Sequence, residues 1–150
     1  MPKLITPNLW FDHNAKEAAE FYVSVFPDSK IISTTYYPTE GLADFQKEYA
    51  GKELIVEYEL CGNRYVAINA GSEFKFNEAV SFSVPCKDQE EIDYYWGKLS
   101  AVPESEQCGW CKDKYGLSWQ IVPENMEELM KRPNAFANMM KMHKIVIADF

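Results

Sequence analysis

The chain of 150 residues has only two histidines and few basic residues for its acidic ones. No stretch approaches the roughly 20 consecutive apolar residues that a membrane-spanning helix needs. Lys and Arg number 15 against 23 Asp and Glu, a net charge of -8, whereas surfaces that bind nucleic acids need clustered basic residues. We therefore expect neither a membrane nor a nucleic acid as a partner.

The sequence also lacks the glycine-rich GxGxxG and Walker-type loops that hold nucleotides, so we expect no cofactor of that kind. It has no linker rich in Gly, Ser or Pro, and its 47% of hydrophobic residues can bury a core, which predicts a single domain over residues 1–150. The first residues lack the layout of a signal peptide, and this predicts a cytoplasmic location.

Two segments of the chain repeat at a spacing of 73 positions. Residues 8–26 and 81–99 each show a short apolar strand, a polar turn and an amphipathic helix, and the pair Phe21-Tyr22 aligns with Tyr94-Tyr95. Any two amphipathic strand-helix segments look somewhat alike. The joint match of strand, turn and aromatic pair nevertheless favours two copies of one supersecondary unit.

The repeat predicts two βαβββ modules, residues 3–70 and 79–123, followed by a helical tail over residues 124–150. The fold class is therefore α+β. Asn14, with Glu17 three residues later, predicts a capping box at the start of the first helix. Asp88 is predicted to cap the helix of the second module, and the segment around Cys61-Gly62 is predicted to turn a hairpin.

Four segments of the sequence resemble a known family. They are residues 9–12 (LWFD), 21–30 (FYVSVFPDSK), 74–79 (FKFNEA) and 107–123, which begins QCGW and ends SWQIVP. Together they resemble the PhnB-like family, also labelled 3-demethylubiquinone-9 3-methyltransferase-like, of the vicinal oxygen chelate superfamily of glyoxalases and dioxygenases. The resemblance implies a glyoxalase-like fold whose paired modules form a curved mixed sheet around a cavity, usually as a homodimer.

Metal-dependent members of this superfamily hold one divalent ion through four side chains on inward strand faces. The resemblance puts these positions at or near Pro7, at Glu57, near Ala79 and at Gln120. Pro and Ala have no ligating side chain, and one carboxylate with one amide does not hold a transition metal tightly. We therefore expect no tightly bound metal.

The aromatic and polar residues on the expected inward strands predict a small-molecule cavity. We expect it to be lined by Trp10, Glu57, Phe76, Cys108, Trp110 and Gln120. Glu57 is the candidate catalytic group, as a general base or hydrogen-bond acceptor. Strand alternation leaves two orientations open: Glu57 faces the cavity, or Glu57 and Glu59 face solvent while Tyr58 faces inward.

The four cysteines are expected as thiols. Cys61 and Cys86 fit small core residues. Cys108 and Cys111 have the spacing of a redox or zinc pair, but they precede a hairpin and positions three apart in a strand face opposite sides.

Three functions stay open at this point. The first is a metal-poor protein that binds a small apolar or aromatic molecule, with catalysis undecided. The second is a metal-assisted lyase or dioxygenase-type enzyme that uses Glu57. The third is a methyltransferase of the ubiquinone pathway, as the family label suggests. We also expect a homodimer that buries apolar residues of the helices and the tail, namely Trp96, Phe136, Met139, Met140 and Met142.

Overall fold

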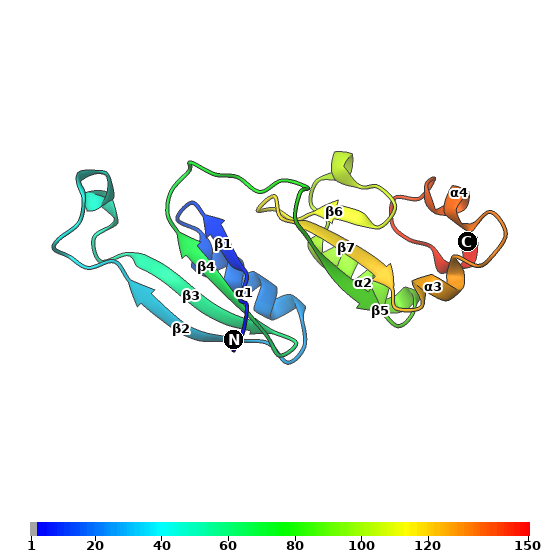
Figure 1. Cartoon of the computed structure of the whole chain (residues 1–150), viewed down its shortest axis with the longest axis horizontal. Helices are drawn as coiled ribbons and strands as arrows, with labels where there is room; N and C mark the ends of the chain where they lie inside the picture. The colour runs from blue at the N-terminus through cyan, green and yellow to red at the C-terminus, as the bar shows by residue number, and fades with distance from the viewer. Residues whose placement is uncertain (1–2) are drawn as a thin grey trace. The chain divides into compact units, whose positions relative to one another are not determined.

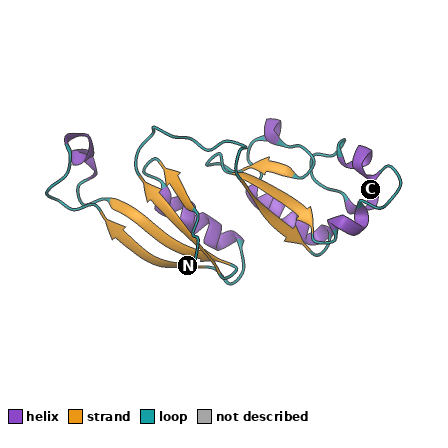
Figure 2. Cartoon of the chain, in the orientation of Figure 1, coloured by secondary structure: helices purple, strands orange, loops and turns teal. Residues whose placement is uncertain are grey.

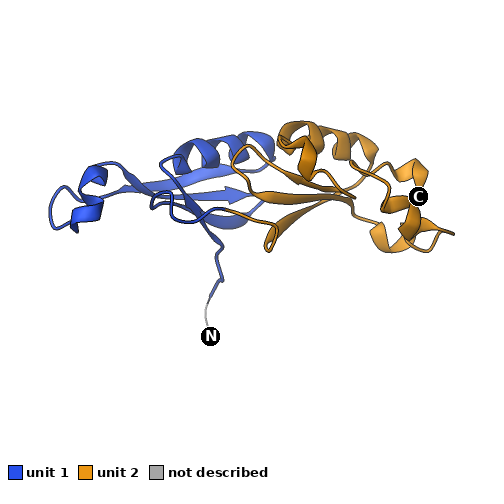
Figure 3. Cartoon of the chain, turned by 90° about the horizontal axis from the view of Figure 1, so that it is seen from above, with its two compact units in different colours: residues 1–75 blue, residues 76–150 orange. Residues whose placement is uncertain are grey.

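The structure is a computed structural model that describes residues 3–150, so Met1 and Pro2 lie outside it. The chain divides into two compact units, Met1–Lys75 and Phe76–Phe150 (Figure 3). Each unit combines a mixed sheet with helices (Figure 2), which confirms the predicted α+β class.

Within residues 3–150, the helices are all too short or too polar to cross a membrane.

The first unit follows the predicted βαβββ order (Figure 1). Its elements are β1 (Asn8–Phe11), α1 (Ala15–Val25), β2 (Lys30–Tyr36), the short 3-10 helix η1 (Asp44–Tyr49), β3 (Glu53–Leu60) and β4 (Asn63–Asn69). The strand order in the sheet is β1-β4-β3-β2, with β1 parallel to β4 and the other neighbours antiparallel.

Helix α1 packs on one face of this sheet. Its buried residues recur at helical spacing and are Ala15, Ala18, Ala19, Tyr22 and Val25. The ring of Tyr22 stacks on that of Tyr58 in β3, with centroids 6.3 Å apart. Burial along β3 alternates with period two, so Val56 and Tyr58 lie in the core while Glu57 and Glu59 lie on the other face.

The start of α1 differs from the predicted capping box. Asn14 makes no side-chain cap hydrogen bond, because its backbone (φ -115°, ψ 22°) lacks the extended conformation that aims an N-cap side chain at the first turn. The side chain of Asn69 in β4 instead accepts a hydrogen bond from the Ala15 N–H at 2.9 Å. The prediction for the second helix is confirmed, since Asp88 is extended and accepts from the Glu91 N–H at 2.9 Å.

The predicted hairpin between β3 and β4 is confirmed. Cys61 and Gly62 both have positive φ, 51° and 83°, as the tight turn of a two-residue hairpin requires. The side chain of Cys61 is exposed at this turn, so the prediction that it lies in the core is wrong.

The second unit has a smaller sheet. Its elements are β5 (Ser81–Cys86), α2 (Gln89–Leu99), the 3-10 helix η2 (Pro103–Ser105), β6 (Trp110–Lys112) and β7 (Ser118–Pro123). The order is β5-β7-β6, with β5 parallel to β7. Among the described residues of this unit the order is βαββ, because η2 stands where the first unit has β2. The segment around η2 contains Pro103 and lacks alternating apolar residues.

The tail is helical, as predicted, and forms α3 (Met126–Leu129), α4 (Ala135–Met139) and the 3-10 helix η3 (Ile147–Asp149). Backbone hydrogen bonds attach it to the start of β6, from Cys108 N–H to Met142 C=O at 2.7 Å and from Gly109 N–H to His143 C=O at 2.8 Å. These bonds draw the chain at Met142 into the unit. Met142 is buried, so its assignment to an exposed dimer surface is wrong.

Candidate functional site

The face of the first sheet that lies opposite α1 carries two of the predicted site residues. We call it the first open face and define it by the side chains of Trp10, Ile55, Glu57, Glu59, Arg64, Val66 and Ile68. Strand register sets Trp10, Ile68 and Ile55 side by side across β1, β4 and β3. The next row contains Val66 and Glu57. An apolar row thus lies beside a carboxylate.

Glu57 is half-exposed, with 39% of its side chain accessible. One carboxylate oxygen lies 3.4 Å from the Arg64 guanidinium, which also lies 4.0 Å from Glu59. Ion pairs at such exposure contribute little to stability. Glu57 therefore has capacity left to accept a hydrogen bond from a ligand. Of the two orientations left open by the sequence, the structure has Tyr58 against α1 and both glutamates on the opposite face.

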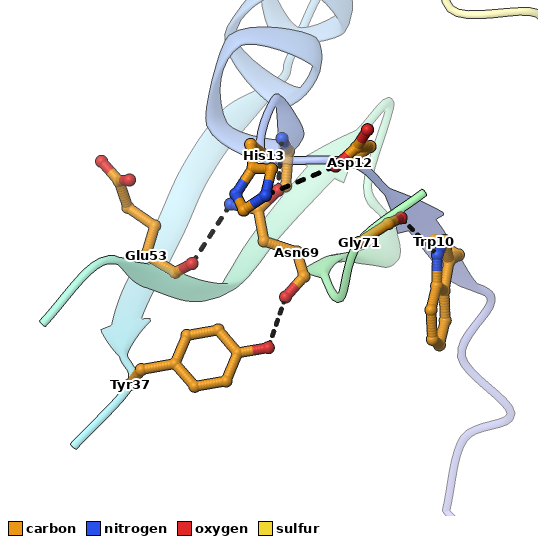
Figure 4. A network of polar contacts seen from close by, with 8 residues as sticks. Trp10, Asp12, His13, Tyr37, Glu53, Asn69 and Gly71 are labelled. Carbon is orange, nitrogen blue, oxygen red and sulfur yellow. Dashed lines mark hydrogen bonds and ion pairs between the residues drawn. The ribbon is translucent and has the colours of Figure 1, made fainter. Parts of the chain in front are cut away.

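The side chain of Trp10 is held at two points. Its indole N–H donates to the Gly71 carbonyl at 2.9 Å (Figure 4). Its ring meets Phe74 edge-on, with centroids 4.8 Å apart and planes at 77°. Fixed aromatic rings of this kind present a contact surface at low entropic cost.

The second sheet also has a face opposite its helix, and two predicted site residues meet there. Trp110 of β6 and Gln120 of β7 are cross-strand partners, and Ser83 of β5 is the partner on the other side of Gln120. The Gln120 amide donates to the Ser81 hydroxyl at 2.9 Å, which orients the amide across the sheet. Trp110 and Gln120 are both half-buried.

The last two predicted site residues lie outside the strands. Cys108 precedes β6, is half-buried and adopts a positive φ of 37°. Phe76 is half-buried in the loop before β5. Trp110 and Gln120 are thus direct neighbours, and Trp10 and Glu57 share a sheet face with β4 between their strands. These two pairs belong to different units.

The residues at the implied metal positions do not fit a transition metal. Pro7 and Ala79 are exposed and offer no side-chain donor. The carboxylate of Glu57 has a guanidinium beside it, and the amide of Gln120 is engaged with a hydroxyl. Within residues 3–150, no cluster of three His, Cys, Asp or Glu side chains could hold an ion. The donor set falls short of the three or four nitrogen, sulfur or carboxylate ligands of such sites.

Sequence reasoning missed a second group of side chains in the first unit. His13, Tyr37 and Tyr49 bring their rings together, with centroids 4.8 Å apart for His13 and Tyr49 and 5.3 Å for Tyr37 and Tyr49. None of the three lies within a strand or α-helix. Hydrophobic periodicity, which finds helices and strands, gave no signal for this group.

The profile of the 3-demethylubiquinone-9 3-methyltransferase family matches residues 3–122. The chain belongs to this family. The PhnB protein from Bacillus cereus, a solved structure, is 32% identical with a TM-score of 0.64, and the match covers 80% of this chain and 99% of that one. A comparison with curated proteins found no match.

More distant solved structures share the fold alone. A protein from Pseudomonas aeruginosa is 16% identical over 81% of this chain and 98% of that chain, with a TM-score of 0.58. The fosfomycin resistance protein FosX from Mesorhizobium loti is 10% identical over 88% of this chain and 99% of that chain, with a TM-score of 0.56. The PhnB-like family, inferred from sequence motifs, is thereby confirmed, and the likeness to FosX shows that the fold is shared.

Proposed function

We propose that the protein binds a small molecule with an apolar or aromatic part on the sheet faces that lie opposite its helices. The proposed ligand-binding residues are Trp10, Glu57, Phe76, Cys108, Trp110 and Gln120. Family membership supports this proposal, as does the mixture of aromatic rings with a few polar groups, which is typical of ligand sites.

The observation that carries the proposal is the apolar row beside Glu57 on the first open face. An aromatic or aliphatic group can lie on Trp10 and Ile68, while a hydroxyl or amine donates to the Glu57 carboxylate. Two strand spacings, about 10 Å, separate β1 from β3, so a drug-sized molecule spans them. A bound ligand would remove water from Glu57, which strengthens that hydrogen bond.

Any proton transfer is assigned to Glu57, because it is the carboxylate beside the apolar row. On the second sheet, the amide of Gln120 and the ring of Trp110 offer one polar and one aromatic contact in the same register row. Phe76 and the thiol of Cys108, both half-buried, add apolar surface in that unit.

Methyl transfer is the second candidate, and the family's name is what favours it. A methyl donor is normally bound on a doubly wound parallel sheet. The described sheets are instead small and mixed, with order β1-β4-β3-β2 in one unit and β5-β7-β6 in the other. We expect no shift in melting temperature with S-adenosylmethionine, and a clear saturable shift would favour methyl transfer over simple binding.

Metal-assisted lyase or dioxygenase chemistry is the third candidate. The donor set around Glu57 and Gln120 argues against it. Elemental analysis of purified protein that finds about one Zn, Mn, Ni or Fe per chain would favour the metal-assisted reaction.

We further propose a homodimer in the cytoplasm. Phe136 and Met140 of the tail are 62% and 44% exposed, and clustered exposed apolar side chains commonly mark protein contacts. Thiols at all four cysteines suit a reducing compartment. Light scattering that gives the monomer mass of 17.3 kDa at micromolar concentration would contradict the dimer.

The binding proposal is tested by native mass spectrometry of gently purified protein, followed by a thermal-shift screen of apolar and aromatic compounds. We expect Glu57→Gln to weaken a hit about tenfold, the loss of one charge-assisted hydrogen bond. Glu59→Gln is the matched control, because Glu59 shares the strand, the face and the Arg64 contact. Equal effects of the two substitutions would contradict the role given to Glu57.

A further inference from the structure

A pocket of about 190 Å³ opens in the first unit beside the start of α1. Its wall contains the rings of His13, Tyr37 and Tyr49 and the carboxylate residues Glu48 and Glu53. We call it the ring pocket. Asn69 also lines the pocket, and its side chain caps α1 on the helix side of the sheet. The ring pocket is therefore separate from the first open face.

The ring pocket is built by a connected set of hydrogen bonds. The Tyr37 hydroxyl donates to the Asn69 carbonyl at 2.6 Å, and the Asn69 side-chain amide donates to the Glu53 carbonyl at 3.1 Å (Figure 4). Asn69 is buried, and its side chain also caps α1. The ring of Tyr37 is therefore fixed by the same residue that positions the helix.

The hydroxyl of Tyr49 lies close to the backbone that follows β4. A side chain at Gly71 would place its Cβ 3.0 Å from the Tyr49 hydroxyl, and Gly71 has a positive φ of 112° that favours glycine. Glycine at this position thus leaves the space that the Tyr49 ring occupies. The Tyr49 ring contacts both the His13 ring and the Tyr37 ring, so the three rings are contiguous.

The electrostatic environment of the wall is negative. Glu48 and Glu53 line the pocket against one basic residue, Lys52. Asp12 adds a carboxylate 3.4 Å from the His13 ring. Burial raises the pKa of Tyr49, and the nearby Glu48 charge raises it further, as expected where negative charge gathers.

We propose that the ring pocket binds a small organic cation, an ammonium group about the size of choline. Aromatic faces attract a cation through their quadrupoles, and nearby carboxylates reinforce this attraction. The excess of acidic over basic residues around the pocket disfavours an anion, although the pocket lies beside a helix N-terminus where anions are often favoured. This proposal does not depend on ligand binding at the sheet faces that lie opposite the helices.

The proposal is tested by calorimetric titration of the full chain with choline, with its neutral isostere 3,3-dimethylbutan-1-ol and with inorganic phosphate. We expect saturable choline binding that weakens as salt is added, and at least about tenfold weaker binding of the isostere and of phosphate. Equal binding of choline and the isostere, or tighter binding of phosphate, would overturn the assignment, as would the absence of saturable choline binding.

Variants locate the binding. Tyr49→Leu removes a ring and is expected to weaken choline about tenfold, whereas Tyr49→Phe keeps the ring and stays within about threefold of the wild type. Glu48→Gln, at an exposed position, serves if Tyr49→Leu does not fold, and it should weaken choline and reduce the salt dependence. Glu57→Gln should leave choline binding unchanged. Loss of binding in Glu57→Gln, or wild-type binding in folded Tyr49→Leu and Glu48→Gln, would put the cation elsewhere and refute the ring pocket.

Discussion

The side-chain oxygen of Asn69 accepts a hydrogen bond from the backbone N–H of Ala15 at 2.9 Å. Strand β4 therefore caps helix α1 across the unit, in place of the residue just before the helix. Asn14, which holds the usual capping position, has a buried side-chain oxygen without a hydrogen-bond partner. Local sequence rules assign the cap to Asn14, whereas Asn69 provides it in the structure.

This relationship predicts an order of stabilities. Asn69→Ala should lower the free energy of unfolding by about 2 kcal/mol, because it removes the helix cap and leaves the Glu53 carbonyl without its donor. Asn14→Ala, the matched control, should change it by about 0.5 kcal/mol or less. Urea denaturation followed by circular dichroism measures both. A larger loss in Asn14→Ala than in Asn69→Ala would show that the local cap dominates.

Asp113 predicts a second stability effect, in the β6–β7 hairpin. Its buried carboxylate accepts hydrogen bonds from the indole N–H of Trp119 at 2.8 Å and from the backbone N–H groups of Tyr115 and Leu117. Asp113→Asn replaces one of the two accepting carboxylate oxygens by an amide NH2 group, which then faces an N–H donor instead of accepting from it. We expect a loss of about 2–3 kcal/mol, measured by denaturant unfolding.

A double-mutant cycle with Trp119→Phe checks the cause. The substitution removes the indole donor, so the pair Asp113→Asn and Trp119→Phe should be less destabilising than the sum of the single substitutions. Strict additivity would mean that the hydrogen bond between these side chains contributes nothing measurable.

The buried thiols predict a loss of stability at alkaline pH. Burial raises the pKa of Cys86 and of Cys111 from the ordinary 9.0 to about 12, with smaller contributions from nearby carboxylates. Between these values the unfolded chain releases the thiol proton and the folded chain keeps it. The contribution of each thiol to the free energy of unfolding is therefore fully present below pH 9.0. It falls as the pH rises towards about 12, by up to about 1.4 kcal/mol per pH unit for each thiol.

Urea unfolding of the wild type and of Cys86→Ala, at several pH values above neutrality, measures this effect. The variant should show a shallower decline, whatever the stability it loses through the small cavity. Equal slopes in the two proteins would mean that the thiol ionises as readily in the folded state as in the unfolded state.

Gly109 predicts how strongly the tail is tied to the second sheet. A Cβ at this position would lie 3.0 Å from the Ile145 side chain and 3.1 Å from the Ile121 carbonyl, and its φ is 90°. Gly116 has a similar φ of 86° but open space around it. Gly116→Ala should lower stability by about 1 kcal/mol through backbone strain alone, and Gly109→Ala by about 3 kcal/mol, because Ile145 must also move.

Thermal unfolding of the two glycine variants gives the comparison, and hydrogen exchange of the tail amides shows whether the tail detaches. We expect faster exchange at residues 142–147 in Gly109→Ala alone. Similar stability and similar tail exchange in both variants would indicate that Ile145 does not pack against the chain at Gly109.

Much of the fold follows from local patterns in the sequence. The alternation along β3, the apolar spacing of α1, the turn at Cys61-Gly62 and the cap at Asp88 are short-range features, and each was predicted from neighbouring residues. The family was also identified from motifs within the chain, because the chain contains long segments that are specific to that family. The residues Trp110 and Gln120 were predicted to share a site, and register makes them neighbours.

Tertiary structure alone decided the rest. The cap of α1 comes from Asn69, far along the chain from Ala15, and no local rule can select a partner at such separation. The replacement of the strand expected in the second module by η2 is, by contrast, a local effect, because the segment contains Pro103 and offers no alternating face. The ring pocket gathers His13, Tyr37 and Tyr49 from loops and a 3-10 helix. Sequence periodicity therefore determined which residues face a core, whereas chain packing determined which distant polar and aromatic groups meet, because those contacts depend on three-dimensional proximity rather than on sequence spacing.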